Sequence, residues 1–286
     1  MKNIFKKQNT TPNSILLTTI ICCSLLTQTT ELQAKPATTN PTTNPTTNPT
    51  NNWTNPTYKK PIFKKAANTG QIKFIRPILP LGNAPGGRRI GGGRRDNCPD
   101  VNPKLTALVP VTEETENIKN VWGLTSAERP TFWFYLPYTK SSKYPTEFVL
   151  QDSNGESIHQ AEISLPEKPG IISISIPNNI APLAIGKQYR WFLKVYCSEQ
   201  KKSLPIYVEG VINRVNLNAI ATQQLRMATP QQQTNIYAQN GMWFQALTTI
   251  GELRRKNPQD TTLKATWNSL LTEIDLIEIA EKPLIY

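Results

Sequence analysis

Residues 188–197 read Gln-Tyr-Arg-Trp-Phe-Leu-Lys-Val-Tyr-Cys, and their alternation decides the fold class. Apolar side chains stand at every second position from Tyr189 to Cys197, on the face opposite Arg190 and Lys194. Because successive side chains of a β-strand point to opposite faces of the sheet, the pattern predicts a strand with one buried face. Cys197 is expected to point inward.

Short β-rich runs divided by turn residues follow one another from Cys98 onward, which is typical of an all-β sandwich. Asn154-Gly155, between two of these runs, is a strong hairpin signal. We predict a β-sandwich of seven strands over residues 98–215. The strands are expected near residues 105–111, 130–138, 146–152, 156–165, 170–177, 188–197 and 204–215.

Beyond the last predicted strand, the apolar spacing changes to a helical period. Thr229-Pro230-Gln231-Gln232 is a capping box that predicts a helix start, and a further helix is expected after Asp260. Small and apolar residues from Gly241 to Pro258 are spaced as in tetratricopeptide helices. We predict about three such helices in residues 216–286, packed on the sandwich, with a peptide-binding groove as the alternative.

The N-terminus has the pattern of an export signal. Three lysines precede the mostly apolar run Ile15–Leu26, which is too short for the roughly 20 residues that span a bilayer. We predict a signal peptide over residues 1–34, cleaved after Ala34, and hence no transmembrane span in the mature chain. An uncleaved signal anchor is the alternative. Both hypotheses place the chain in the periplasm or at the cell surface.

Export leaves two cysteines, Cys98 and Cys197, in an oxidising compartment. We predict a disulfide between them, with two free thiols as the alternative. With one histidine and so few cysteines, the sequence predicts neither a metal site nor a cofactor.

The positive charge of the chain is concentrated in residues 35–97. Of the formal net charge of +12, this segment carries +10, whereas residues 98–286 have 18 basic and 18 acidic side chains. Thr-Thr-Asn-Pro repeats at 38–49 disfavour helix and sheet, so we predict a disordered linker. Its cations are expected to attach to an anionic polysaccharide or membrane surface, not to nucleic acid, and a solvated spacer is the alternative. The residues assigned to this contact are Lys59, Lys60, Lys64, Lys65, Arg88, Arg89, Arg94 and Arg95.

Two resemblances bear on the fold. Leu183 and Gly186 precede Tyr189 as in the penultimate strand of fibronectin type III domains, where the tyrosine hydroxyl bonds back across a corner. Over residues 86–282 the chain resembles an exported cyanobacterial family catalogued as domain of unknown function 928. This resemblance implies an extracytoplasmic setting and brings no known activity with it. The matching blocks include Cys98-Pro99 and residues 105–110, 125–138, 147–152, 186–191, 208–210 and 243–253.

Residues for catalysis are scarce. His159 is the single histidine, and its place beside the Asn154-Gly155 turn indicates a surface position. Cys197 is not expected to act as a nucleophile if it is bridged, because only a thiolate attacks. A carboxylate pair acting on a glycosidic bond is the remaining enzyme hypothesis, but nothing in the sequence places two carboxylates in one cleft. The candidates are Glu113, Glu114, Glu116, Glu128, Glu209 and Glu252.

Aromatic residues offer the best candidate for binding. Phe132, Trp133, Phe134 and Tyr135 are consecutive, so a strand sends two of them to each face. If one face is core, Trp133 and Tyr135 form a binding patch on the other, unless the C-terminal helices cover them. We therefore predict a non-catalytic interaction module of the cell envelope that binds protein or polysaccharide. A carbohydrate-active hydrolase is the alternative.

Overall fold

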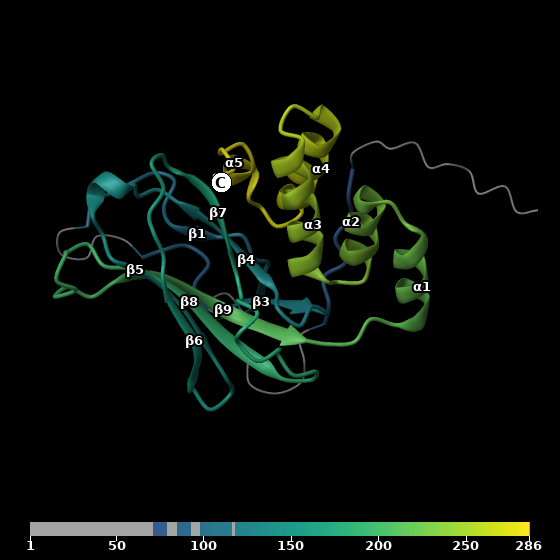
Figure 1. Cartoon of the computed structure of the whole chain (residues 1–286), viewed down its shortest axis with the longest axis horizontal. Coiled ribbons are helices and arrows are strands. Elements are labelled where there is room, and N and C mark those ends of the chain that lie inside the picture. Colours follow the sequence, from purple (N-terminus) through teal and green to yellow (C-terminus); the bar gives the residue numbers. More distant parts are fainter. Residues whose placement is uncertain (1–70, 79–84, 93–97, 116–117, 286) are drawn as a thin grey trace, which may run out of the picture. The chain divides into compact units, whose positions relative to one another are not determined.

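The computed structural model describes residues 71–78, 85–92, 98–115 and 118–285, which form a mainly β structure followed by helices (Figure 1). The strands in chain order are β1 (Thr106–Ala107), β2 (Val111–Thr115), β3 (Ile118–Thr125), β4 (Thr131–Leu136), β5 (Thr146–Gln151), β6 (Ser157–Glu162), β7 (Gly170–Ser175), β8 (Gln188–Val195) and β9 (Ile206–Arg214). The helices are α1 (Ala219–Met227), α2 (Pro230–Gln239), α3 (Trp243–Lys256), α4 (Thr261–Thr272) and α5 (Ile277–Ala280), with one 3₁₀ turn at Lys140–Ser142.

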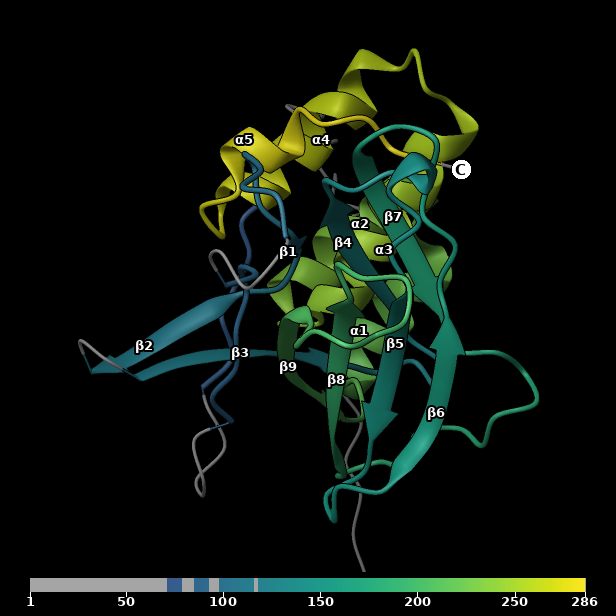
Figure 2. The ribbon, with the colours of Figure 1, turned by 90° about the vertical axis from the view of Figure 1, so that its left-hand side faces the viewer.

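The strands form two sheets (Figures 1 and 2). The smaller sheet has the order β1-β4-β7, and the larger has the order β2-β3-β9-β8-β5-β6. Neighbouring strands are antiparallel except β3 and β9, which run parallel. We call the two sheets the small sheet and the large sheet.

Aromatic side chains fill the space between the two sheets. The Phe132 ring of β4 lies 5.0 Å from that of Phe148 in β5 and 6.1 Å from that of Trp191 in β8. Phe134, two residues further along β4, lies 5.7 Å from Trp191. All four side chains are fully buried. Because large aromatic rings bury the most apolar surface, this cluster is a major source of stability for the two-layer arrangement.

The helices cover the opposite face of the small sheet. Trp133 of β4 lies 5.7 Å from the ring of Trp267 in α4, and its indole N–H donates to the hydroxyl of Thr248 in α3 at 3.0 Å. A Cβ on Gly251 of α3 would come within 2.5 Å of the Trp133 ring, so glycine allows this close approach. The prediction that the helical region packs on the β-structure is confirmed.

The helix boundaries follow the predicted capping signals. Thr229 and Gln232 form the reciprocal capping box at the start of α2, and the Asp260 carboxylate caps α4 by accepting from the Leu263 N–H at 3.1 Å. The prediction of about three helices is too low, because residues 216–285 contain five. The two that the prediction missed are α1, which is capped by Asn218 and buries Ala221 alone, and α5, which is a single turn.

The prediction of seven strands is also wrong in number, because the described part of the chain has nine. The first predicted strand, 105–111, is divided into β1 and the beginning of β2, with Pro110 between them. The missed hairpin of β2 and β3 contains the polar run 112–120, whose charged side chains obscure the alternation. The remaining predicted strands correspond to β4 to β9.

The predicted disordered linker is wrong for residues 71–78 and 85–92, which pack on the body. Ile72 and Phe74 are buried, and the Phe74 ring lies 4.9 Å from that of Trp243. Arg88 exchanges two backbone hydrogen bonds of 2.9 Å with Glu209 in β9. These apolar and backbone contacts outweigh the charge that dominates the local sequence. The signal segment and the rest of 35–97 lie outside the described residues.

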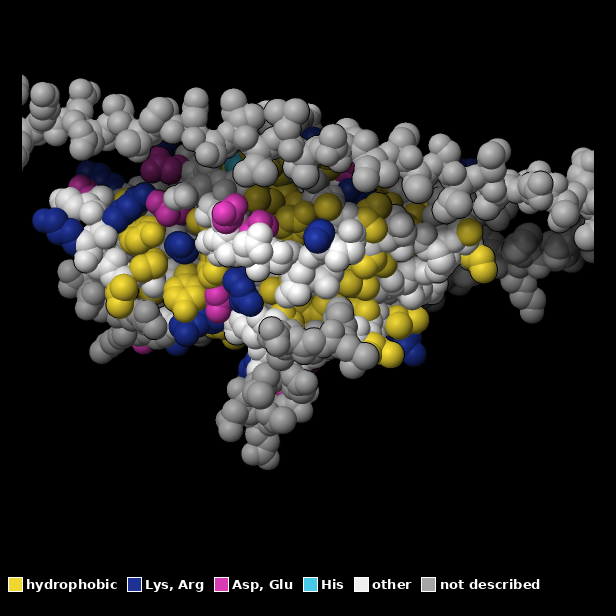
Figure 3. Space-filling view, turned by 90° about the horizontal axis from the view of Figure 1, so that it is seen from below, with side chains coloured by type: hydrophobic (Ala, Val, Ile, Leu, Met, Phe, Trp, Pro, Cys, Tyr) yellow, Lys and Arg dark blue, Asp and Glu magenta, His cyan; other side chains and the backbone are white. Residues whose placement is uncertain are grey.

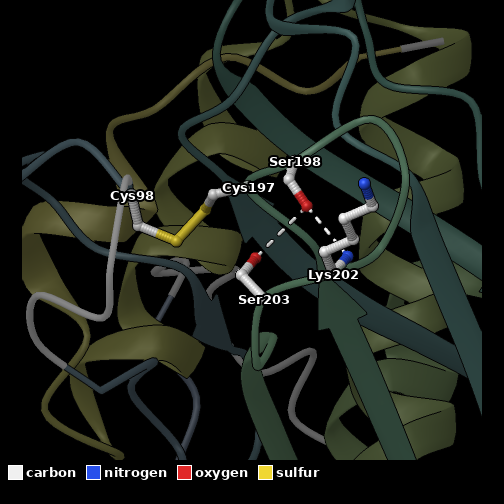
Figure 4. Close-up of a disulfide and its surroundings, with 5 residues drawn as sticks. All are labelled: Cys98, Cys197, Ser198, Lys202 and Ser203. Atoms are coloured by element: carbon white, nitrogen blue, oxygen red, sulfur yellow. Dashed lines mark hydrogen bonds between the residues drawn. A yellow bond between two sulfur atoms is a disulfide. The ribbon is translucent and has the colours of Figure 1, made fainter.

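The predicted disulfide between Cys98 and Cys197 is present (Figure 4). Both cysteines are buried, so Cys197 points inward as expected. The turn that follows is held by the Ser198 hydroxyl, which accepts from the Lys202 N–H at 3.0 Å and from the Ser203 hydroxyl at 3.5 Å. Since Cys197 follows β8 and Cys98 precedes β1, the bond connects the large sheet to the segment that enters the small sheet.

Candidate functional site: the outer face of the large sheet

The predicted aromatic patch is buried. Trp133 is 1% exposed and Tyr135 is 5% exposed. α3 and α4 cover Trp133, and burial together with the nearby charge of Glu278 in α5 raises the pKa of Tyr135. The patch hypothesis is therefore wrong, and the alternative that C-terminal helices cover these rings is correct.

The open aromatic surface lies instead on the large sheet. Strand β8 turns Trp191 and Leu193 into the core, so the residues between and beyond them, Phe192, Lys194 and Tyr196, point away from it. Figure 3 views the side on which β6, β8 and β9 lie in Figure 1, and there hydrophobic side chains are interspersed with Lys, Arg, Asp and Glu. We define the outer face by Glu147, Val149, Gln160, Glu162, Arg190, Phe192, Lys194, Tyr196, Tyr207 and Glu209, with Arg88 and Lys201 beside them.

Each of the three aromatic rings on the outer face has a cation over it. The Arg88 guanidinium carbon lies 4.8 Å from the centre of the Tyr207 ring. Lys194 Nζ lies 5.2 Å from the centre of Phe192, and Lys201 Nζ lies 5.4 Å from that of Tyr196. Such contacts are favourable and hold the cations close to the sheet. The outer face thus presents flat apolar rings next to hydrogen-bond donors.

A buried carboxylate organises one end of the outer face. Glu147 is 8% exposed and accepts from Lys201 Nζ, from the Tyr196 hydroxyl at 3.4 Å and from the Gln160 amide at 3.5 Å. The hydrogen bond to Glu147 raises the pKa of Lys201 above its usual value. Burial, followed by the charge of Glu147, raises the pKa of Tyr196. Lys201 and Tyr196 are therefore protonated at neutral pH and act as donors.

Arginines connect residues 85–92 to the other end of the outer face. Arg190 donates to the carbonyl of Pro85 at 2.7 Å, and its guanidinium lies 3.9 Å from the Glu209 carboxylate. Arg88 stacks on Tyr207, whereas Arg89 turns away and donates to the carbonyl of Ile274 at 2.7 Å. Of the predicted linker cations, these two arginines thus have fixed places in the fold. Lys59, Lys60, Lys64, Lys65, Arg94 and Arg95 lie outside the described residues.

Arg89 lines a pocket of about 400 Å³ next to the β2–β3 hairpin. Desolvation lowers the pKa of Arg89, and the negative charges of Asp275 and Glu113 partly oppose this effect. Lys119 and Glu113, also at the pocket, form an ion pair of 2.9 Å. The positive and negative groups nearly balance, so the pocket has no strong preference for the charge of a ligand.

Four of the six carboxylates proposed for hydrolysis are described by the structure, and each of the four is bound to a cation. Glu128 lies 3.2 Å from Arg214, Glu209 is associated with Arg190, and Glu252 lies 2.9 Å from Arg255. Glu113 pairs with Lys119, as described above. The positions of the Glu114 side chain and of Glu116 lie outside the described residues. Each of these four described side chains is thus engaged by a different cation.

His159 lies in β6, half-buried, with its ring 6.3 Å from that of Phe148. Within the part of the chain that the structure describes, no group of three His, Cys, Asp or Glu side chains could hold a metal ion. Among the same residues, none of the helices has the length and apolar character needed to cross a bilayer.

Sequence reasoning missed Phe192, Tyr196 and Tyr207. The signal was present in residues 188–197, because the alternation that buries Trp191 also turns Phe192 and Tyr196 outward. Tyr207 lies opposite Lys194 on the neighbouring strand β9, and this register could not be read from the sequence.

Comparisons with known proteins place the chain in a family without assigning an activity. No curated protein matches it. Among solved structures, the soluble domain of PmoD from Methylocystis sp. ATCC 49242 aligns with 40% of this chain and 94% of that one, at 8% identity and a TM-score of 0.26. That likeness is too weak to inform fold or function. The family model described as Domain of Unknown Function (DUF928) matches residues 90–284, and the chain therefore belongs to this family.

Proposed function

We propose that this protein is a non-catalytic interaction module of the cell envelope that binds protein or polysaccharide through the outer face of the large sheet. The observation that carries the proposal is the set of three half-buried rings, Phe192, Tyr196 and Tyr207, each with a cation over it. Aromatic side chains supply most of the energy at binding surfaces because they bury large apolar areas at low entropic cost.

The outer face suits both ligand classes. Flat rings stack on the apolar faces of sugars, and the ammonium and guanidinium groups beside them donate hydrogen bonds to hydroxyl, carboxylate or peptide oxygens. Glu147 and Glu209 hold Lys201 and Arg190 in place, so less side-chain entropy is lost when a ligand binds. A preorganised mixed surface of this kind favours a specific polar ligand over a purely apolar one.

The disulfide supports an exported location, because disulfides persist in oxidising compartments. We extend the proposal to a signal peptide over residues 1–34, a cyanobacterial periplasmic or surface setting, and a basic tether that now comprises residues 35–70. Because residues 71–78 and 85–92 pack on the body, the proposed tether must end before residue 71.

The proposal also covers the finer classification of the fold as a fibronectin III- or immunoglobulin-like sandwich. The parallel pairing of β3 with β9 supports it, as does the Tyr189 hydroxyl, which accepts from the Ala184 N–H at 2.9 Å and so bonds back across the corner. The tetratricopeptide-like nature of α2 and α3 remains a prediction.

Retention on envelope fractions tests the proposal. The full mature chain is mixed separately with purified envelope polysaccharide and with detergent-extracted envelope protein. Phe192→Ala combined with Tyr207→Ala should lower retention on one of the two by at least about tenfold, because each ring contributes on the order of 1 kcal/mol or more. Ile220→Ala, which removes an exposed apolar side chain from α1, is the matched control and should bind normally.

A chain lacking residues 35–70 separates the tether from the outer face. If the chain lacking residues 35–70 loses retention at low salt and the double variant does not, the binding belongs to the tether. Retention of the double variant equal to that of Ile220→Ala would refute the role of the outer face.

A further inference from the structure

The edge of β7 is partly occupied by the chain's own C-terminal residues. β7 pairs with β4 on one side. On the other side, the N–H of Ile171 donates to the carbonyl of Pro283 at 2.8 Å, and the N–H of Ile285 donates to the carbonyl of Ile171 at 2.8 Å. Residues 283–285 therefore add a short parallel segment to this edge, and Figure 2 shows the C-terminus beside β7.

The edge continues past the segment 283–285. In an antiparallel pair, alternate residues bond to the partner strand while those between them point away. Because Ile171 bonds away from β4, Ser173 and Ser175 must also direct their N–H and C=O groups to the open side. Trp133, opposite Ser173, directs its carbonyl to Leu108 on the far side of β4, in agreement with this assignment. Within the described part of the chain, no backbone hydrogen bond reaches Ser173 or Ser175 from the open side.

A groove lies along the same edge. Its volume is about 780 Å³, and it runs between β6 and β7, which are the outermost strands of their sheets. Apolar side chains from both layers reach it. They are Ile163 and Leu165 beyond β6, Ile172 and Ile174 of β7, and Ile285 of the C-terminal segment.

We propose that the β7 edge is a strand-addition site that takes an extended segment of a partner protein with apolar side chains at alternate positions. Main-chain hydrogen bonds to Ser173 and Ser175 supply affinity, and the groove receives every second side chain. Ile285 displays this mode, since its side chain lines the groove while its backbone bonds to Ile171. The site shares Glu162 with the outer face but lies along another strand edge, and it goes beyond the function proposed for that face.

The charges around the groove define the partner further. Lys140, Lys168 and Arg255 face Glu162 and Glu167, so positive and negative groups nearly cancel. Lys140 and Glu167 form an ion pair of 3.2 Å. A segment of low net charge therefore fits better than a strongly acidic or basic one. Such an occupant would also cover an exposed strand edge, which proteins otherwise protect from non-specific pairing.

Amide hydrogen exchange tests the proposal directly. The probe is a ten-residue synthetic peptide in which Thr and Val alternate between terminal lysines, added to the full-length chain. It should slow exchange at Ser173 and Ser175 by at least about tenfold, because bonded amides exchange only on opening. Unchanged exchange at millimolar peptide, or slowing confined to the edges of β2 or β6, would overturn the proposal.

A matched pair of variants tests the role of the backbone donor. Ser175→Pro and Ser175→Ala both remove the hydroxyl that bonds to Thr131 at 2.8 Å, but only proline removes the outward N–H. Proline is tolerated on an edge strand where the N–H faces solvent. Ser175→Pro should bind the peptide at least about tenfold more weakly than Ser175→Ala. Equal binding by the two would refute strand addition, and the exchange measurement stands without either variant.

Discussion

Strands β4 and β8 carry the two aromatic runs of the protein, and they use them differently. In β4, all four side chains from Phe132 to Tyr135 are buried, with exposed fractions of 0–5%. In β8, Trp191 is buried while Phe192, its neighbour, remains half-buried at the surface. Both strands alternate in the same way. They differ in what lies above them, because helices cover the free face of the small sheet, whereas the outward side chains of β8 stay half-buried.

This difference separates the aromatic face that is buried in the fold from the one that we propose for binding. Burial of Trp133 between the small sheet and the helices stabilises the attachment of the whole C-terminal region. Phe192 and Tyr207 are only half-buried, and their rings belong to the surface that we propose for binding. A run of aromatic residues alone therefore does not indicate a binding surface, because a layer of helices that covers the run makes it part of the core.

The largest expected effect comes from removing the covered ring. Trp133→Ala should lower the free energy of unfolding by about 3–5 kcal/mol, because it leaves a cavity and removes the N–H that donates to the Thr248 hydroxyl. Phe192→Ala should cost about 1 kcal/mol or less, because its ring is already partly solvated. Urea unfolding monitored by circular dichroism measures both. An equal decrease in the free energy of unfolding for the two variants would contradict the conclusion that Trp133 is part of the core and Phe192 is not.

The disulfide ranks next, because it connects the β8 side of the structure with the entry to the small sheet. Cys98 and Cys197 are 99 positions apart, and loop-closure reasoning gives a stabilisation of about 2–5 kcal/mol. The double replacement of both cysteines by serine should lower the unfolding free energy by that amount. Reduction of the wild-type protein should have the same effect and should leave the double variant unchanged. A wild-type midpoint insensitive to reductant would show that the bond adds no stability.

The smallest effect concerns the tyrosines that follow the two strands. Burial, with smaller contributions from Tyr144 and Asp100, raises the pKa of Tyr138 from 10.0 to about 12. Because the folded pKa is the higher one, the contribution of Tyr138 is complete below pH 10. It is lost as the pH rises from 10 to 12, by at most about 2.7 kcal/mol. Tyr196 also has a raised pKa, from burial and Glu147.

Spectrophotometric titration can compare these tyrosines. The difference between the wild-type protein and Tyr138→Phe should show a phenol ionising near pH 12. The difference between the wild-type protein and Tyr196→Phe should show a phenol whose pKa lies above the ordinary value for tyrosine. Ionisation of Tyr138 near pH 10 would mean that its surroundings are more solvated than its exposed fraction of 3% implies.

Much of the local structure was accessible from the sequence. The alternation at 188–197 gave β8 its buried and open faces, and the Thr229–Gln232 capping box placed the start of α2. The hairpin of β2 and β3 was not accessible, because its charged positions hide the period of two. Its stability comes from pairing across the hairpin and, for β3, from the parallel bonds to β9.

The candidate site was less accessible than the fold. Sequence reasoning chose Trp133 and Tyr135 over Phe192 and Tyr196, although the same rule of alternation applied to both strands. The rule assigns a side chain to a face, but it does not say whether another layer covers that face. The sequence likewise placed Arg88 in a solvated linker, whereas the structure pairs its backbone with β9.

By itself, the sequence determined the periodic features of this protein, namely its strand faces and helix caps, because these depend on neighbouring residues. Only the tertiary structure decided which aromatic face is fully buried, where residues 71–78 and 85–92 belong, and that the β7 edge borders a groove. These features depend on contacts between residues far apart in the chain, such as Trp133 with Trp267 and Phe74 with Trp243. Local sequence patterns define the faces of each strand and helix, and long-range packing decides which of those faces are buried.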